Sequence, residues 1–207
     1  MPKVVDHAAR RDEIAQVACR VVAEYGFEHA TVARIARAAG YTTGMLAHYY
    51  ESKQDIILAA LRLMLKRIDE RLAHARHGPD SDLIDVLSEA LAIDAQRFTE
   101  SAFWMAFWGQ ISADKKLKKI NAWVHREYMR LFARCFAEHW SEWSTWPSTV
   151  RDRVLRSTVI FMNGLTASAV TSPGDWPPPV QVEQLRLQLN LWRHWAKTAR
   201  LARRKGE

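Results

Sequence analysis

The stretch TVARIARAAGYTTGMLAHYY, from Thr31 to Tyr50, decides the fold that this chain of 207 residues is expected to adopt. Its apolar residues recur three and four positions apart, which predicts two short amphipathic helices. Thr31 is placed to cap the first helix, Gly40 to end it, and Thr42 or Thr43 to cap the second. Two short helices joined by a glycine-containing turn make a helix-turn-helix, whose second helix enters the major groove of DNA.

The outward face of the second predicted helix supplies candidate contacts to DNA. Leu46 and Tyr50, four residues apart, should point into the core, which leaves the side chains between them facing out. Lys53 lies in the first turn of the next helix, where free amides and the helix dipole favour a phosphate. The predicted DNA-binding residues are Thr31, Thr42, Thr43, Gly44, Met45, His48, Tyr49 and Lys53.

Helices are also predicted on both sides of this motif. Residues 8–25 carry an apolar stripe that Gly26 ends, and this helix should hold the other two at a fixed angle. A longer helix follows from Ser52 to about Arg76, and it should link the three-helix headpiece to the rest of the chain. The sequence HGPD, residues 77–80, interrupts the pattern and predicts a loop.

The segment resembles the DNA-binding headpiece of the TetR family of bacterial transcriptional regulators. The resemblance covers about residues 8–70, and it implies a DNA-binding domain over residues 1–53 and a ligand-binding and dimerisation domain over residues 54–207. It also implies that Lys53 contacts the DNA backbone. The shared pattern is carried by Thr31, Ile35, Ala36, Ala39, Gly40, Gly44, His48, Tyr49, Tyr50 and Lys53.

The composition predicts an all-α protein. Only eight glycines and seven prolines interrupt long helical patterns, so we expect about nine helices: the headpiece and a larger C-terminal helical bundle. The formal net charge of +7 favours an anionic partner only weakly, because the excess lies at residues 115–119 and 193–205 rather than in the headpiece.

The remaining composition agrees with a cytoplasmic protein. Cys19 and Cys135 are too few for a disulfide framework and fit buried apolar positions. The first residues show no apolar run of the kind found in signal peptides. The longest uncharged run, residues 157–174, is marginal in length for a membrane span and is apolar on nearly all sides, which predicts a buried helix.

The second half of the chain is rich in aromatic residues, beginning with FTESAFWMAFWGQ at residues 98–110. Aromatic residues at helical spacing can simply fill the core, or they can line a pocket for a quaternary ammonium group or a flat apolar molecule. The region is similar to the choline-responsive repressors of betaine synthesis within the TetR family, although Asn163 stands where those relatives usually carry Asp. The candidate ligand-binding residues are Trp104, Phe107, Trp108, Trp123, Tyr128, Phe161 and Asn163.

The last helix carries more apolar surface than a monomer needs. Leu185 and Leu189 lie on one face, while Leu187 and Leu191 lie on a second. One explanation is a homodimer in which the last two helices of each subunit form a four-helix bundle, and the other is ordinary core packing. TetR relatives use the dimeric arrangement, which would also pair two recognition helices on a palindrome.

Together these features predict a homodimeric repressor that a small molecule releases from double-stranded DNA. A helical-bundle enzyme is the alternative, but the chain has no Glu-x-x-His pair for a di-iron site, P-loop, nucleophile elbow or HExxH motif. We therefore expect no catalytic residues, metal or cofactor. A ligand-binding module without a DNA function is a further alternative.

Overall fold

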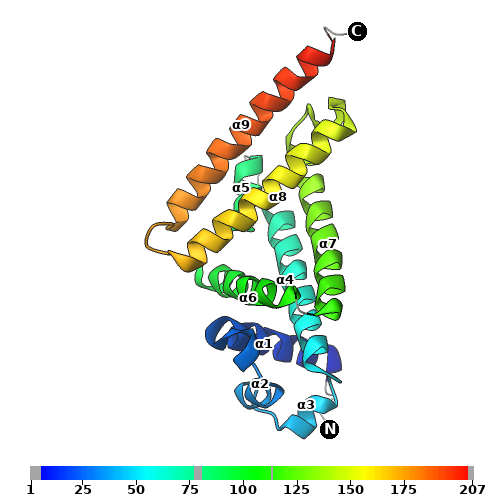
Figure 1. The fold of residues 1–207 in the computed structure, drawn as a ribbon, viewed down its shortest axis with the longest axis vertical. Helices are drawn as coiled ribbons and strands as arrows, with labels where there is room; N and C mark the ends of the chain where they lie inside the picture. The colour runs from blue at the N-terminus through cyan, green and yellow to red at the C-terminus, as the bar shows by residue number, and fades with distance from the viewer. Residues whose placement is uncertain (1–5, 77–80, 113, 205–207) are drawn as a thin grey trace. The chain divides into compact units, whose positions relative to one another are not determined.

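The computed structural model describes residues 6–76, 81–112 and 114–204, with side chains described as far as residue 198 (Figure 1). In this part of the chain every regular element is helical, which confirms the predicted all-α class. The predicted loop at residues 77–80 lies outside the described residues. The elements are α1 (His7–His29), α2 (Val32–Ala38), α3 (Thr43–Ala47), α4 (Lys53–Arg76), α5 (Leu83–Ser88), α6 (Ala95–Ile111), α7 (Lys115–His139), a 3-10 helix (Trp143–Thr145), α8 (Ser148–Thr171) and α9 (Pro178–Arg204).

Two glycines shape the headpiece, as the sequence predicts. Gly26 has a φ of 77° inside α1 and breaks it, so that residues 27–29 form a separate short turn. Gly40 has a φ of 75° just after α2. Both glycines therefore adopt a left-handed conformation that residues with a Cβ rarely tolerate, and each ends a helix at the position expected of it.

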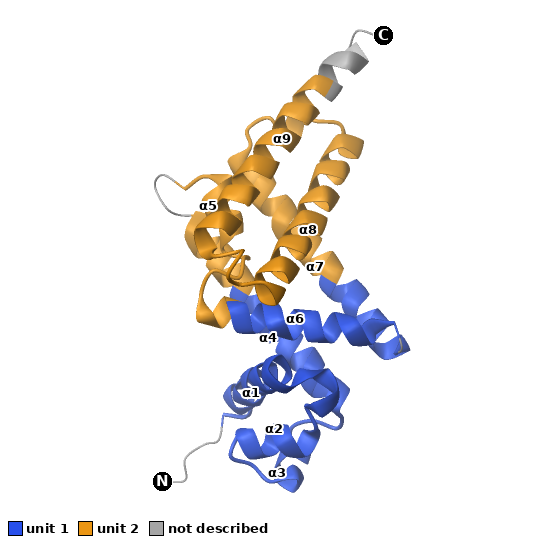
Figure 2. Cartoon of the chain, turned by 60° about the vertical axis from the view of Figure 1, so that its left-hand side comes forward, with its two compact units in different colours: residues 1–67, 98–124 blue, residues 68–97, 125–207 orange. Residues whose placement is uncertain are grey.

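The helices form two compact units, shown in different colours in Figure 2. Unit 1 contains residues 1–67 and 98–124, and unit 2 contains residues 68–97 and 125–207. The first half of α4 and most of α6 thus pack with the headpiece, a grouping that differs from a division of the chain at residue 53.

Contacts inside unit 1 explain this grouping. The Cys19 sulfur of α1 lies 3.7 Å from the Met64 sulfur of α4 in the core. The Arg67 guanidinium of α4 lies 3.6 Å from the carboxylate of Glu100, a buried residue of α6. These contacts join segments that are more than 30 residues apart in the sequence.

Unit 2 is built around a cluster of aromatic side chains. The Phe136 ring of α7 stacks on Trp143 with centroids 4.7 Å apart and meets Trp140 edge to face at 4.8 Å. Trp146 lies 5.6 Å from each of these two tryptophans. All four side chains are buried, so these tryptophans act as core residues.

The prediction that α8 would be buried on all sides is wrong for Ile160. Most of α8 is indeed covered: Val154, Val159 and Met162 are buried. Ile160, however, is 71% exposed, because only one side of α8 packs within the chain. A large aliphatic side chain that stays in water contributes no hydrophobic stabilisation to the fold. Ile160 is therefore a candidate for contact with another molecule.

Candidate nucleic-acid interface

The recognition element of the headpiece is α3, and threonine hydroxyls cap both helices of the motif. The Thr31 hydroxyl accepts a hydrogen bond of 3.2 Å from the Arg34 amide at the start of α2. The Thr42 hydroxyl accepts one of 3.1 Å from the Met45 amide, so Thr42 rather than Thr43 caps α3. These caps fix where each helix begins and leave Thr43 exposed in the first turn of α3.

The two faces of α3 divide as the sequence predicts. Leu46 and Tyr50 are buried at 1% and 6% exposure, and they anchor the segment to the core of unit 1. Thr43, Gly44 and His48 are exposed, as is Met45 at 48%. A five-residue helix anchored on one side thus presents small, apolar and imidazole groups on the other, which suits contact with base edges in the major groove.

Tyr49 is half-buried, and its ring packs against two other aromatic rings. Its ring centroid lies 5.4 Å from that of His7 and 5.9 Å from that of Tyr41. The side chain is therefore restrained by α1 and by the turn before α3, while remaining partly exposed.

Lys53 is already engaged within the headpiece. Its ammonium donates a hydrogen bond to the Phe27 carbonyl and lies 4.3 Å from the centroid of the Phe27 ring. Burial lowers the pKa of this ammonium, while the charge of Glu28 acts in the opposite direction. The sequence does not reveal this contact, because Phe27 and Lys53 are 26 residues apart.

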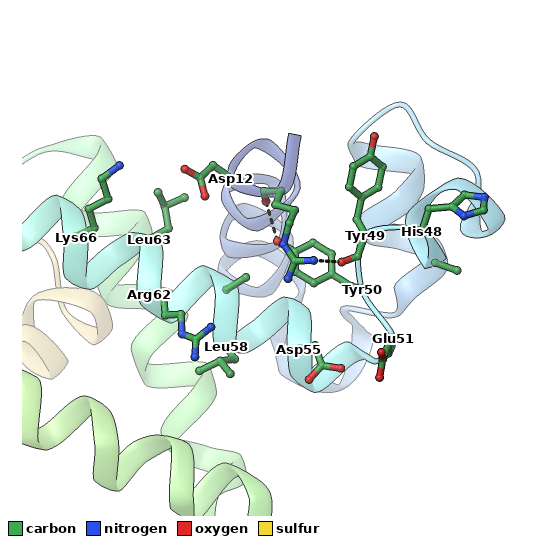
Figure 3. A pocket seen from close by; sticks show the side chains of 13 residues that line it. Asp12, His48, Tyr49, Tyr50, Glu51, Asp55, Leu58, Arg62, Leu63 and Lys66 are labelled. Carbon is green, nitrogen blue, oxygen red and sulfur yellow. Dashed lines mark hydrogen bonds between the residues drawn. The ribbon is translucent and has the colours of Figure 1, made fainter. Parts of the chain in front are cut away.

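A groove of about 680 Å³ lies beside α3 in unit 1 and is lined by residues of α1, of α4 and of the segment that follows α3 (Figure 3). It is bordered by the outward residues His48 and Tyr49 and by charged side chains of both signs. Arg11 lines it and donates a hydrogen bond to the Tyr49 carbonyl, a contact across 38 residues that the local sequence pattern does not reveal. The lining residues are Arg11, Asp12, Ala47, His48, Tyr49, Tyr50, Glu51, Asp55, Leu58, Ala59, Arg62, Leu63 and Lys66.

The predicted ligand-binding residues are divided between the two units, and none of them lines this groove. Four belong to unit 1: Trp104, Phe107 and Trp108 of α6, and Trp123 of α7. Phe107 is fully buried, whereas the three tryptophans are half-buried. Trp104 lies 5.9 Å from Phe107 and 6.0 Å from Trp108, measured between ring centroids.

The other three candidates, Tyr128, Phe161 and Asn163, belong to unit 2 and are half-buried. Tyr128 packs on Phe132 at 4.7 Å, and Phe161 meets the Trp192 ring of α9 at 5.9 Å. Both rings therefore pack against other aromatic side chains of unit 2, as core residues do.

Both cysteines are buried, as predicted. Burial raises the pKa of the Cys19 thiol to about 12 and that of Cys135 to about 11. At neutral pH each is a protonated, unreactive side chain.

The fold and this interface define the chain as an all-α helix-turn-helix protein. Comparison with known families gives the next level. The family model of bacterial regulatory proteins of the tetR family matches residues 14–60. The family model of the C-terminal region of BetI-type transcriptional repressors matches residues 79–194. The chain belongs to the TetR family of regulators, with a C-terminal region of the BetI type.

Individual relatives agree with this assignment. The chain is 30% identical over 110 residues to the HTH-type transcriptional regulator PksA of Bacillus subtilis, covering 52% of this chain and 54% of that protein. It is 29% identical over 145 residues to the HTH-type transcriptional regulator BetI of Serratia proteamaculans, covering 67% and 71%. The alignment with PksA thus spans about half the length of that relative.

Solved structures share the fold. A transcriptional regulator from Rhodococcus sp. Rha1 superposes with a TM-score of 0.76 at 22% identity, covering 90% of this chain and 97% of that one. A putative transcriptional regulator from Saccharomonospora viridis, solved in complex with choline, gives a TM-score of 0.72 at 18% identity, covering 86% and 94%. These relatives are transcriptional regulators rather than enzymes. Among the helices that the structure describes, none is long and apolar enough to cross a membrane.

Proposed function

We propose that this chain is a homodimeric transcriptional repressor that binds a palindromic operator and leaves it when a small molecule binds. The observation that carries the proposal is the outward face of α3, which is exposed at Met45 and His48 while Leu46 and Tyr50 anchor the helix. A helix held in this way can enter the major groove without losing its packing.

The contacts to DNA are of two kinds. Thr43, Met45, His48 and Tyr49 would reach base edges, and they would supply sequence preference. Lys53, together with the hydroxyls of Thr31 and Thr42, would face phosphates, with the backbone of Gly44 free to approach closely. One N–H of the Lys53 ammonium is used by Phe27, and the other two are available for a phosphate.

The dimer is supported by an apolar surface on α8 and α9. Leu187 and Leu191 are 51% and 54% exposed, and Ile160 is 71% exposed. On the opposite face of α9, Leu185 and Leu189 are buried within the chain. A helix with one apolar face packed and a second one open is suited to pairing with its symmetry mate in a four-helix bundle.

The effector is expected to carry a quaternary ammonium group or a flat apolar surface. The half-buried indoles of Trp104, Trp108 and Trp123 offer π faces of the kind that attract cations. The guanidinium of Arg62 already lies 5.7 Å from the centroid of the Trp123 ring, within the range of such an attraction. A neighbour of the same fold was solved with choline.

The effector can be tested by thermal shift with choline and its neutral isostere 3,3-dimethylbutanol. A ligand bound by the native state raises the melting temperature, and the cation-π account expects a rise with choline but not with the neutral compound. A rise with both would indicate an apolar site instead. No rise with either would remove quaternary ammonium compounds from the proposal.

DNA binding is tested by selecting duplexes from random DNA with the whole protein. Recovery of a palindromic sequence, bound more tightly than a scrambled duplex and less tightly at higher salt, is the expected result. Tyr49→Ala should then reduce the preference for the selected duplex. If no sequence is enriched, the chain is a ligand-binding module rather than a repressor.

A further inference from the structure

The recognition helix is too short to hold its own position. Helix α3 contains five residues, and a helix of this length is not stable without outside contacts. Its last hydrogen bonds run from the amides of Tyr49 and Tyr50 back to the Leu46 carbonyl, at 2.9 and 3.1 Å. The course of the backbone after Leu46 must therefore be fixed by contacts with another helix.

Arg11 of α1 provides that contact through three interactions. Its guanidinium donates a hydrogen bond to the Tyr49 carbonyl, and its own carbonyl accepts one of 2.9 Å from the Tyr50 hydroxyl (Figure 3, dashed lines). The same guanidinium lies 4.3 Å from the centroid of the Tyr50 ring. One residue thus holds the backbone at Tyr49 and the side chain at Tyr50, across 38 residues of sequence.

The ring of Tyr49 is restrained from the same part of α1. His7 precedes Arg11 by four positions, so the two side chains lie on one face of that helix. The His7 ring contacts the Tyr49 ring at 5.4 Å. Backbone and ring of Tyr49 are therefore both held by the first turns of α1.

We infer that Arg11 is a positioning residue for DNA recognition, which aims the end of α3 and the side chain of Tyr49 at the base edges. The inference rests on the proposed DNA-binding function and adds a residue outside the helix-turn-helix to it. Base discrimination depends on geometry, whereas binding to phosphates depends mainly on charge. Loss of Arg11 should therefore reduce sequence preference far more than it reduces total affinity for DNA.

Arg10 supplies a matched control at the neighbouring position. Its guanidinium pairs with Glu13 at 2.7 Å on the surface of α1, and its side chain is 48% exposed. Arg10→Met and Arg11→Met remove the same charge from the same turn. Only the second removes a direct contact to Tyr49, because Arg10 interacts with Glu13 and with Tyr41 instead.

The experiment measures fluorescence anisotropy with the duplex selected by the wild-type protein and with a scrambled duplex of the same composition. Arg11→Met should lower the ratio of the two affinities by about tenfold. Arg10→Met should leave the ratio within about twofold of wild type, and both variants should bind the scrambled duplex equally. Tyr50→Phe, which keeps the ring and loses one hydrogen bond, should lower the ratio by about threefold.

The inference is overturned if Arg11→Met preserves the ratio, or if both arginine variants weaken binding to the two duplexes in parallel, as simple phosphate contacts would. If circular dichroism shows that Arg11→Met does not fold, Tyr50→Phe decides, and an unchanged ratio in that variant rejects the inference. A wild-type protein that selects no sequence rejects the repressor function itself, a result distinct from both of these and one that removes the basis of the inference.

Discussion

At the scale of single residues, Lys53 already has a partner within the protein when no DNA is bound. The sequence places it in the first turn of a helix, where the free backbone amides favour binding of a phosphate. The structure adds the carbonyl and ring of Phe27 as neighbours. Lys53 thus joins the start of α4 to the turn after Gly26, so its substitution should affect both stability and DNA binding.

We predict that Lys53→Met weakens binding to selected and scrambled duplexes alike and lowers the salt slope of log affinity by about 1. It should also lower the free energy of unfolding by about 1 kcal/mol, because the Phe27 carbonyl loses its donor. Anisotropy titrations at several salt concentrations and urea unfolding measure the two effects.

Lys118→Met is the control for this substitution, since it removes the same charge from an exposed position on α7. It should change neither the salt slope nor the stability appreciably. An equal effect of both variants on the slope would show that Lys53 contributes only to net charge.

Short-range features of the headpiece could be predicted from the sequence, and long-range contacts could not. The caps at Thr31 and Thr42 depend on amides three residues away, so the local pattern reveals them. The partners of Arg11 and Lys53 lie 38 and 26 residues away and depend on how α1 crosses the other helices. Those crossings are set by packing, which the spacing of apolar residues does not specify.

At the scale of elements, α9 is tied to the 3-10 helix by a carboxylate. Glu142 accepts hydrogen bonds from Arg193 Nε at 2.6 Å and Nη2 at 3.0 Å, and Lys197 lies 3.5 Å away. The bonds from Arg193 lower the pKa of Glu142 from its ordinary 4.5 to about 2. Since the native state holds this carboxyl ionised, the pair stabilises the fold above about pH 4.5 and loses its effect toward pH 2.

We predict that Glu142→Gln lowers the free energy of unfolding by about 1 kcal/mol at pH 7, a modest value because Arg193 is 40% exposed and solvent screens the pair. The difference from wild type should close as the pH falls from about 4.5 to about 2. Urea unfolding followed by tryptophan fluorescence across this pH range measures it.

Glu127→Gln provides the comparison, because Glu127 forms a surface ion pair with Arg130, whose side chain is 73% exposed. This variant should follow the wild-type curve at every pH. A difference between Glu142→Gln and wild type that stays constant down to pH 2 would contradict the assigned role of the ion pair.

Helices were predictable as elements, while their surroundings were less so. The apolar pattern of α8 correctly predicts a helix, but it led to the wrong expectation that every side would be covered. Periodicity records which residues avoid water in the functional state, and it does not distinguish a core neighbour from a second chain. Ile160 is the position where that ambiguity becomes visible.

At the scale of the whole molecule, the proposed repressor consists of two chains. The exposed face formed by Leu187 and Leu191 of α9, together with Ile160 of α8, is the proposed dimer surface. We predict that Leu187→Glu or Leu191→Glu converts the protein to a monomer, because a carboxylate at the centre of such an interface would be buried without a partner. Sedimentation velocity measures the change.

Ala122→Glu is the control, since it places the same carboxylate at an exposed position of α7. This variant should sediment as the wild type does. If the leucine variants also keep the wild-type sedimentation coefficient, the dimer surface lies elsewhere; if the wild type is itself monomeric, the paired reading of a palindrome fails.

The size of the complex with DNA tests the central claim most directly. Sedimentation of the wild-type protein with the duplex recovered by selection should give two chains per palindromic duplex, and a scrambled duplex should bind more weakly at the same salt concentration. One chain per duplex, or equal affinity for the selected and scrambled sequences, would contradict the account.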